Sequence, residues 1–232
     1  MVITSLPDLP SPRGFMGGAF LENFIYIIGG STTSKDGEPT RDFLRLDLRN
    51  VGSAGARWES LPPYPESGVF LPAIAGQDGC DGKLLYVLGG LPVIPDSEKF
   101  GLANNKRGLL SNYTFNPRNM TWKQLPEVSY SGPWSSGEVY SFGGAAALPV
   151  GKNKIFLFGG FDDEYIRLIL SYDTFTREWF EEGLLFNGGP YSKVIGWKGN
   201  IYLWGGYNPS SNDSRLFGYK FAESKVNEGC AH

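Results

Sequence analysis

The sequence predicts an all-β fold in which four repeats form one domain. Four near-copies of one apolar heptapeptide occur along the 232 residues, and each copy ends in a pair of glycines. The chain also holds 32 Gly and 16 Pro, a composition that suits many short strands joined by tight turns. All-β chains of this length commonly fold as a single domain, so a second unrelated domain is not required.

The heptapeptides are predicted to be the second strand of each repeat. Each is a continuous run of aliphatic and aromatic residues stopped by glycine, which fits a strand buried on both faces better than a helix. The paired glycines allow positive φ, or a close approach of backbone where a Cβ would clash. The four copies are residues 24–30, 84–90, 154–160 and 200–206.

Three further strands are expected around each heptapeptide. Small residues come before it, which indicates crowding where the innermost strands of several sheets converge on one axis; they occupy 17–19, 73–76, 143–147 and 194–196. A third strand follows a variable loop, at 43–47, 110–114, 168–173 and 215–219. In the first three repeats Trp58, Trp122 and Trp179 begin a fourth strand. We expect these large flat side chains to wedge between neighbouring sheets, where they bury the most area.

This repeat resembles that of the kelch repeat family, and the resemblance covers nearly the whole chain. Each repeat has an apolar strand that ends in a glycine pair, then a Tyr-Asp type strand, and then a tryptophan. The resemblance implies a kelch-type β-propeller in which each repeat supplies one four-stranded blade. The second glycines of the pairs, Gly30, Gly90, Gly160 and Gly206, are 60, 70 and 46 residues apart, against roughly 50 for a kelch unit. The extra length is expected in loops, at 91–107 and 51–55.

Residues 1–232 are predicted to be one propeller domain, with repeats at approximately 13–65, 66–130, 137–185 and 186–226. The fourth repeat has Val226 where the spacing would place a tryptophan. We expect residues 1–10 to complete this last blade and so close a ring of four blades, because closure removes exposed sheet edges. The alternatives are that the chain is a portion of a longer propeller, or that it assembles with another copy.

Residue types that carry catalysis are scarce in this sequence. His232 is the only histidine, which argues against Ser-His-Asp and Cys-His nucleophilic catalysis. Cys80 and Cys230 are interpreted as reduced thiols, and no Cys/His cluster has the spacing of metal ligands. We therefore predict no catalytic residue, no metal site and no cofactor.

Charge and hydropathy argue against two classes of partner. The net charge of −3 gives no field that would attract phosphate backbones, so nucleic acid is not expected. No run approaches the roughly 18 apolar residues of a membrane span, and no basic leader with an apolar core is evident. A cytoplasmic protein without membrane contact is the expectation.

The family resemblance implies that ligands approach the face formed by blade-connecting loops and by loops that follow the glycine pairs. Aromatic side chains with a few Arg and Asp have the composition of binding hot spots. Trp134 is the strongest candidate, because residues 130–137 have no strand pattern that would bury it. The predicted ligand-binding residues are Arg13, Arg41, Tyr64, Trp134, Phe161, Asp162, Asp163, Tyr191, Tyr207 and Asn208.

Two functions follow from these observations. The first is a noncatalytic recognition module that binds a protein or peptide through the blade-connecting loops. The alternative is an enzyme acting on a small organic molecule or sugar in the central channel, as a metal-independent isomerase or cyclase of the mutarotase or epimerase kind. In that case one carboxylate of Asp162, Asp163 or Glu164 would serve as anchor or general base beside Arg13 or Arg167. The alternative is that these three acidic residues form a solvated turn. An enclosed pocket with carboxylates would favour the enzyme, and an open channel with exposed aromatic residues would favour the recognition module.

Overall fold

Four antiparallel sheets make up the computed structural model, and each is built from strands that follow one another in the chain. The structure describes residues 5–32, 38–53, 55–92, 111–128, 142–161, 166–185 and 190–206, together with the backbone of 217–219. Within these ranges it has fifteen strands and one short 3-10 helix, η1 (Leu48–Asn50). None of the helical structure in these ranges is long enough to cross a membrane.

The sheets are the blades of a β-propeller, as predicted. Blade 1 contains β1 (Gly17–Leu21), β2 (Phe24–Ile28), β3 (Phe43–Asp47) and β4 (Trp58–Ser60). Blade 2 contains β5 (Ala73–Gly79), β6 (Gly82–Leu88), β7 (Asn112–Asn116) and β8 (Thr121–Leu125). Blade 3 contains β9 (Ala146–Val150), β10 (Lys154–Phe158), β11 (Leu168–Asp173) and β12 (Glu178–Leu184). Blade 4 contains β13 (Ser192–Trp197), β14 (Asn200–Gly205) and β15 (Phe217–Tyr219).

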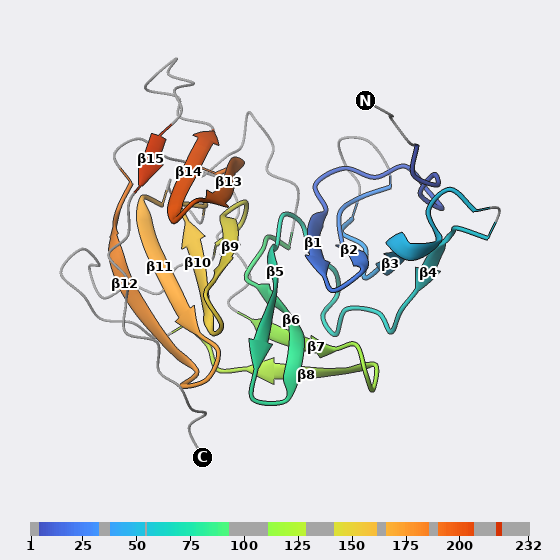
Figure 1. The fold of residues 1–232 in the computed structure, drawn as a ribbon, viewed down its shortest axis with the longest axis horizontal. Coiled ribbons are helices and arrows are strands. Elements are labelled where there is room, and N and C mark those ends of the chain that lie inside the picture. Colours follow the sequence, from blue (N-terminus) through green and yellow to red (C-terminus); the bar gives the residue numbers. More distant parts are fainter. Residues whose placement is uncertain are drawn as a thin grey trace.

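The blades follow one another in an arc, from blade 1 in blue to blade 4 in orange and red (Figure 1). The first strand of each blade is the innermost, and β1 packs on β5, β5 on β9, and β9 on β13. Among the described strands, no contact of comparable extent joins β13 back to β1. The heptapeptides are the second strands β2, β6, β10 and β14, which confirms their predicted place.

Side-chain alternation along these second strands builds the junctions between blades. The third and fifth residues of each heptapeptide face the next blade, and the second and fourth face the preceding one. Tyr26 and Ile28 meet Leu85 and Val87; Tyr86 and Leu88 meet Ile155 and Leu157; Phe156 and Phe158 meet Ile201 and Leu203. All twelve side chains are at most 6% exposed, so the repeat pattern reflects these three junctions.

The glycine pairs have the steric role that was predicted. Both glycines of each pair have positive φ. At Gly29, with φ +67°, a Cβ would collide with the backbone oxygen of Val69, which lies in the segment that leads to blade 2. Only glycine therefore fits where the second strand turns beside the neighbouring segment.

The tryptophans that begin the fourth strands pack toward the preceding blade. Trp122 of blade 2 contacts Phe43 of blade 1, with ring centroids 5.0 Å apart, and its Nε1 donates to the Pro62 oxygen at 3.0 Å. Trp179 of blade 3 belongs to the apolar cluster shared with blade 2. The predicted wedging of these two side chains between blades is confirmed.

The N-terminal segment, which was expected to complete blade 4, is described from residue 5 onward. Its described part, residues 5–10, contains no strand, and the Pro7 oxygen accepts a hydrogen bond of 3.0 Å from Trp58 Nε1 of blade 1. The N-terminal segment therefore contacts blade 1 at Trp58. In the part of the chain that the structure describes, blade 4 has three strands, and residues 5–10 do not add a fourth.

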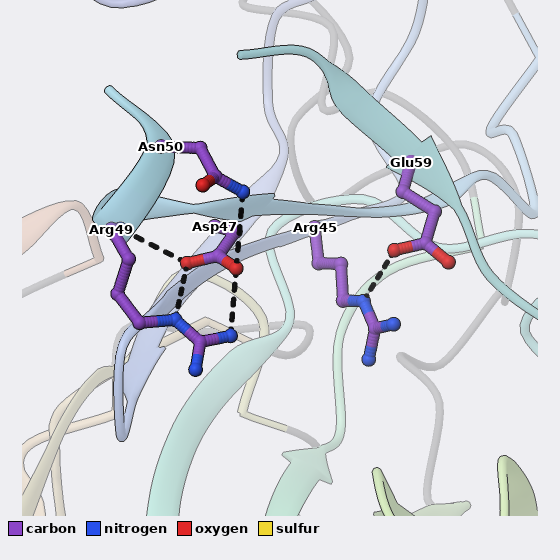
Figure 2. Close-up of polar contacts among 5 residues, drawn as sticks. All are labelled: Arg45, Asp47, Arg49, Asn50 and Glu59. Carbon is purple, nitrogen blue, oxygen red and sulfur yellow. Dashed lines mark hydrogen bonds and ion pairs between the residues drawn. The ribbon is translucent and has the colours of Figure 1, made fainter. Parts of the chain in front are cut away.

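Polar contacts at the outer edge of blade 1 fix β3, β4 and the turn between them (Figure 2). Arg45 Nε of β3 donates to Glu59 Oε2 of β4 at 2.8 Å. Asp47 caps η1 by accepting from the Arg49 backbone N–H, and the Arg49 guanidinium donates to both of its oxygens. These hydrogen bonds lower the pKa of Asp47, which therefore stays ionised as a cap.

One prediction about the cysteines is wrong. Cys80 lies on the turn between β5 and β6 and is disulfide-bonded rather than reduced. Cys230, the other cysteine of the chain, lies outside the described residues.

Candidate functional site at the axial cavity

The inner strands surround a cavity of about 230 Å³ at the end of the axis where the glycine pairs lie. Its walls are residues 16–18, 71–74, 144–147 and 191–194, which are the first residues of the four inner strands and those just before them. Each blade therefore contributes the same part of its repeat. This end of the propeller carries the blade-connecting loops, which is the face where the sequence placed binding.

Small residues dominate the wall because the inner strands come close together. A Cβ on Gly17 would lie 2.8 Å from the Pro72 ring, and a Cβ on Gly143 would collide with the Leu91 side chain. The predicted crowding is thus confirmed. Since glycine and alanine expose backbone, much of the wall offers peptide groups rather than side chains.

A ladder of backbone hydrogen bonds links the blades around the mouth of this cavity. A residue with positive φ lies one or two positions before each inner strand: Phe15, Leu71, Gly144 and Tyr191. The Leu71 N–H donates to the Phe15 oxygen at 2.7 Å, Gly144 to Leu71 at 2.8 Å and Tyr191 to Gly144 at 2.8 Å. Three of the four residues are not glycine, and positive φ costs such a residue about 1–3 kcal/mol. The ladder therefore holds the mouth in one shape against local backbone strain.

Three polar residues of blade 4 are part of the cavity wall: Tyr191, Ser192 and Lys193. Lys193 is exposed and lies opposite Trp204 in the register of β13 and β14. Of the described residues that line the cavity, it is the one basic residue, and none is a carboxylate. No ion pair between described residues involves Lys193. The wall therefore suits a ligand that brings a carboxylate of its own.

Three of the predicted ligand-binding residues, Arg13, Arg41 and Tyr64, make contacts that hold blade 1 together. Arg13 has a buried side chain that donates to Asp42 Oδ2 at 2.7 Å and to the Gly29 oxygen at 3.2 Å. Arg41 Nε donates to the Tyr64 oxygen at 2.7 Å. Both guanidiniums thus hold loops of blade 1 in place.

Tyr64, which was expected on a surface loop, is a core residue. Its side chain is fully buried and meets the rings of Tyr113 and Trp122 edge to face, at centroid distances of 5.5 and 5.8 Å. Burial raises the pKa of the Tyr64 phenol, so it stays neutral. Sequence reasoning placed it in a loop correctly but could not show that this loop folds inward beneath β7 and β8.

The remaining predicted residues divide between the cavity and the parts of the chain not described. Tyr191 lines the cavity. Phe161 is half-buried directly after the third glycine pair, and its N–H donates to the Gly143 oxygen at 2.9 Å. Trp134, Asp162, Asp163, Tyr207 and Asn208 lie outside the described residues.

Lys193 and Ser192 were missed by the sequence analysis, although a signal for them exists. In the strand register Lys193 is equivalent to Gly17, Ala73 and Ala146, the residues opposite the fifth residue of each heptapeptide. The other three inner strands have glycine or alanine at this position, so a lysine there distinguishes blade 4 from the other blades.

Comparisons with known proteins agree with the repeat pattern, although no family model matches the sequence. Kelch-like protein 40 of Xenopus tropicalis is 26% identical over 217 residues, which cover 91% of this chain and 30% of that protein. N-acetylneuraminate epimerase of Haemophilus influenzae (strain 86-028NP) is 28% identical over 208 residues, which cover 78% of this chain and 50% of that protein. The chain thus spans half or less of the length of these relatives.

Among solved structures, that of YjhT superimposes with a TM-score of 0.64 at 19% identity, covering 87% of this chain and 60% of that one. This similarity shows the fold.

Proposed function

Because the chain belongs to the kelch-repeat family of β-propellers, we propose that it is a noncatalytic recognition module that binds a protein or peptide at the mouth of the axial cavity. The partner presents an acidic side chain to Lys193. The observation that carries the proposal is the makeup of the described cavity wall, which combines one cation and one tyrosine with small residues and has no carboxylate.

Proton-transfer chemistry is poorly supported by this wall. General acid–base catalysis needs titratable groups placed on the reacting atoms, and an isomerase needs a group that accepts a proton and one that returns it. The described wall holds an exposed lysine and a tyrosine, and no carboxylate lies beside them. A charged lysine beside exposed backbone groups is better suited to hydrogen bonding and ion pairing with a peptide.

A peptide array tests this proposal directly, because it presents many candidate sequences at once. The array would hold random peptides alongside copies in which every Asp and Glu is replaced by Asn and Gln. We expect the wild-type chain to select acidic peptides, and Lys193→Ala to weaken their binding at least tenfold. Lys198→Ala is the matched control, because Lys198 is an exposed lysine on the next turn of the same blade but not part of the cavity wall. Equal binding by Lys193→Ala and wild type would refute the proposal.

A second candidate is a small-molecule enzyme that acts on an acidic sugar. The observation in its favour is the similarity to N-acetylneuraminate epimerase over 78% of this chain, since the sugar in that name carries a carboxylate that Lys193 could bind. Proton NMR of N-acetylneuraminate distinguishes the two functions. If the protein accelerates exchange between the anomers of this sugar and Lys193→Ala abolishes the acceleration, the enzyme is the correct function and the recognition module is refuted. If the exchange rate is unchanged at high protein concentration, the protein is not an enzyme for this sugar.

A further inference from the structure

The sequence contains three copies of the acceptor motif for N-linked glycans, Asn-X-Ser/Thr with X other than proline. They begin at Asn112, Asn119 and Asn212. The structure describes the first two, and Asn212 lies outside the described residues. Because a glycan is bulky and hydrophilic, the folded chain can carry one only on an asparagine whose side chain reaches solvent.

The motif at Asn119 lies on the surface. Asn119 is an exposed residue of the turn between β7 and β8, and this turn projects from blade 2 beyond the ends of the two strands (Figure 1). The Thr121 hydroxyl donates to Asn119 Oδ1 at 2.7 Å, so the two side chains of the motif lie together. Among the described residues, none forms a hydrogen bond with Asn119 Nδ2, the atom to which a glycan is attached.

The motif at Asn112 is part of the interior of blade 2. Asn112 is 1% exposed. Its Oδ1 accepts a hydrogen bond of 3.0 Å from the Gly89 N–H, and its Nδ2 donates to the Pro126 oxygen at 3.4 Å. A glycan on this nitrogen would have no room and would remove the contact with Pro126. The fold therefore accepts a glycan at Asn119 and excludes one at Asn112.

Cys80 provides an independent observation about the chemical environment of the chain. It lies on the turn between β5 and β6 and is disulfide-bonded. Disulfides persist in secreted proteins and in the lumen of the endoplasmic reticulum, whereas cytosolic reductants keep thiols reduced. Surface Asn-X-Ser/Thr motifs are used as glycan acceptors in proteins of this same secretory route.

We propose that this chain enters the secretory route and carries an N-linked glycan on Asn119. The donor is a lipid-linked oligosaccharyl diphosphate. Asn119 Nδ2 forms a bond to the anomeric carbon of the first sugar, and the bond from that carbon to the diphosphate oxygen breaks. The diphosphate leaves with the electron pair of the broken bond, and the proton lost from Nδ2 balances its charge. The compartment differs from the cytoplasm that was expected from the sequence.

The glycan lies away from the axial cavity. Strand β6 runs toward Gly89 and Gly90, at the cavity end of the axis, and β7 is antiparallel to it. The turn between β7 and β8 is therefore at the opposite end of the blade. The mouth of the cavity stays uncovered, so this proposal does not depend on the proposed function.

Mass spectrometry tests the proposal on the protein isolated from the cells that naturally produce it. An amidase that removes N-linked glycans converts each occupied asparagine to a carboxylate, which takes up heavy oxygen when the reaction is run in isotopically labelled water. We expect this label on Asn119 and no label on Asn112. The protein should also migrate faster on a denaturing gel after the treatment.

Three variants expressed in the same cells identify the acceptor. Thr121→Ala should abolish the glycan although Asn119 itself remains, and Thr121→Ser should keep it, because serine also completes the motif. Thr121 is exposed, so neither change is expected to disturb the fold. Thr114→Val is the matched control, because it removes the motif at Asn112 and should leave the glycan in place.

Three results would overturn the proposal. The first is a wild type in which Asn119 carries no label. The second is equal labelling of Asn112 and Asn119, which would show that the fold does not select between the motifs. The third is a glycan that persists on Asn119 in Thr121→Ala.

Discussion

Leu85→Ala is expected to destabilise the junction between blades 1 and 2 by about 3–4 kcal/mol. Leu85 is the second residue of the blade 2 heptapeptide, is fully buried and packs in the cluster with Tyr26 and Ile28 of blade 1. Loss of three buried carbons removes about 2.4 kcal/mol of transfer free energy, at about 0.8 kcal/mol each. The cavity left behind adds to this, and buried Leu→Ala changes cost about 2–5 kcal/mol in total.

The assay is unfolding followed by circular dichroism, in urea and by heat. A loss of 1 kcal/mol lowers the Tm of a domain of this size by about 2–4 °C, so Leu85→Ala should lower it by about 6–16 °C. Leu184→Ala is the matched control, because Leu184 is also on a strand but is 43% exposed. We expect it to lose less than about 1 kcal/mol, in line with its small burial. If both variants lost the same stability, the second strands would not form the junctions described above.

Three further predictions concern backbone conformation, a buried arginine and a buried phenol. Gly29→Ala should lower the free energy of unfolding, measured by urea titration, by more than about 1 kcal/mol, because φ is +67° and a Cβ would collide with the Val69 oxygen. Gly55→Ala is the control, because a Cβ on Gly55 has no such contact, and it should change this free energy by less than about 0.5 kcal/mol. Arg13→Ala should cost about 1–3 kcal/mol, because it leaves the Gly29 oxygen without this donor and removes the ion pair with Asp42; an effect no larger than that of the exposed Arg57→Ala would contradict the structural role. Burial raises the pKa of Tyr172 to about 12, so the folded chain keeps this proton while the unfolded chain loses it above the ordinary value of about 10. Stability should therefore fall between about pH 10 and pH 12, and Tyr172→Phe, measured by denaturant titration at pH 8 and pH 11, should reduce that fall.

The sequence was sufficient to predict the blades because their signal repeats. Each second strand is stopped by glycines that have positive φ, and each carries side chains that must fill two junctions at once. Trp122 and Trp179 could be placed between blades for the same reason, since a large apolar ring at a fixed point of each repeat has one large surface to bury.

The N-terminal segment could not be placed from the sequence. Residues 1–10 were expected in blade 4 because that repeat ends without its tryptophan. In the described part, Pro7 instead accepts a hydrogen bond from Trp58 of blade 1. This contact involves one indole N–H, and no periodic pattern in the sequence predicts it.

The candidate site was predicted less well than the fold. The predicted residue Tyr191 lines the cavity, at the end of the propeller where ligand binding was expected. Arg13, Arg41 and Tyr64 were predicted as ligand-binding residues because loops rich in Arg and aromatic residues resemble binding sites. In the structure these three residues hold blade 1 together. Whether a loop side chain points outward depends on tertiary contacts such as those of Tyr64 with Tyr113 and Trp122. Comparison of equivalent inner-strand positions would have found Lys193.

A crystal structure of the chain with an acidic peptide selected from the array tests the central claim most directly. The account predicts a carboxylate of the peptide within ion-pair distance of Lys193, about 4 Å or less, at the end of the axis where the glycine pairs lie. A peptide bound on another surface, with this cavity empty, would contradict it.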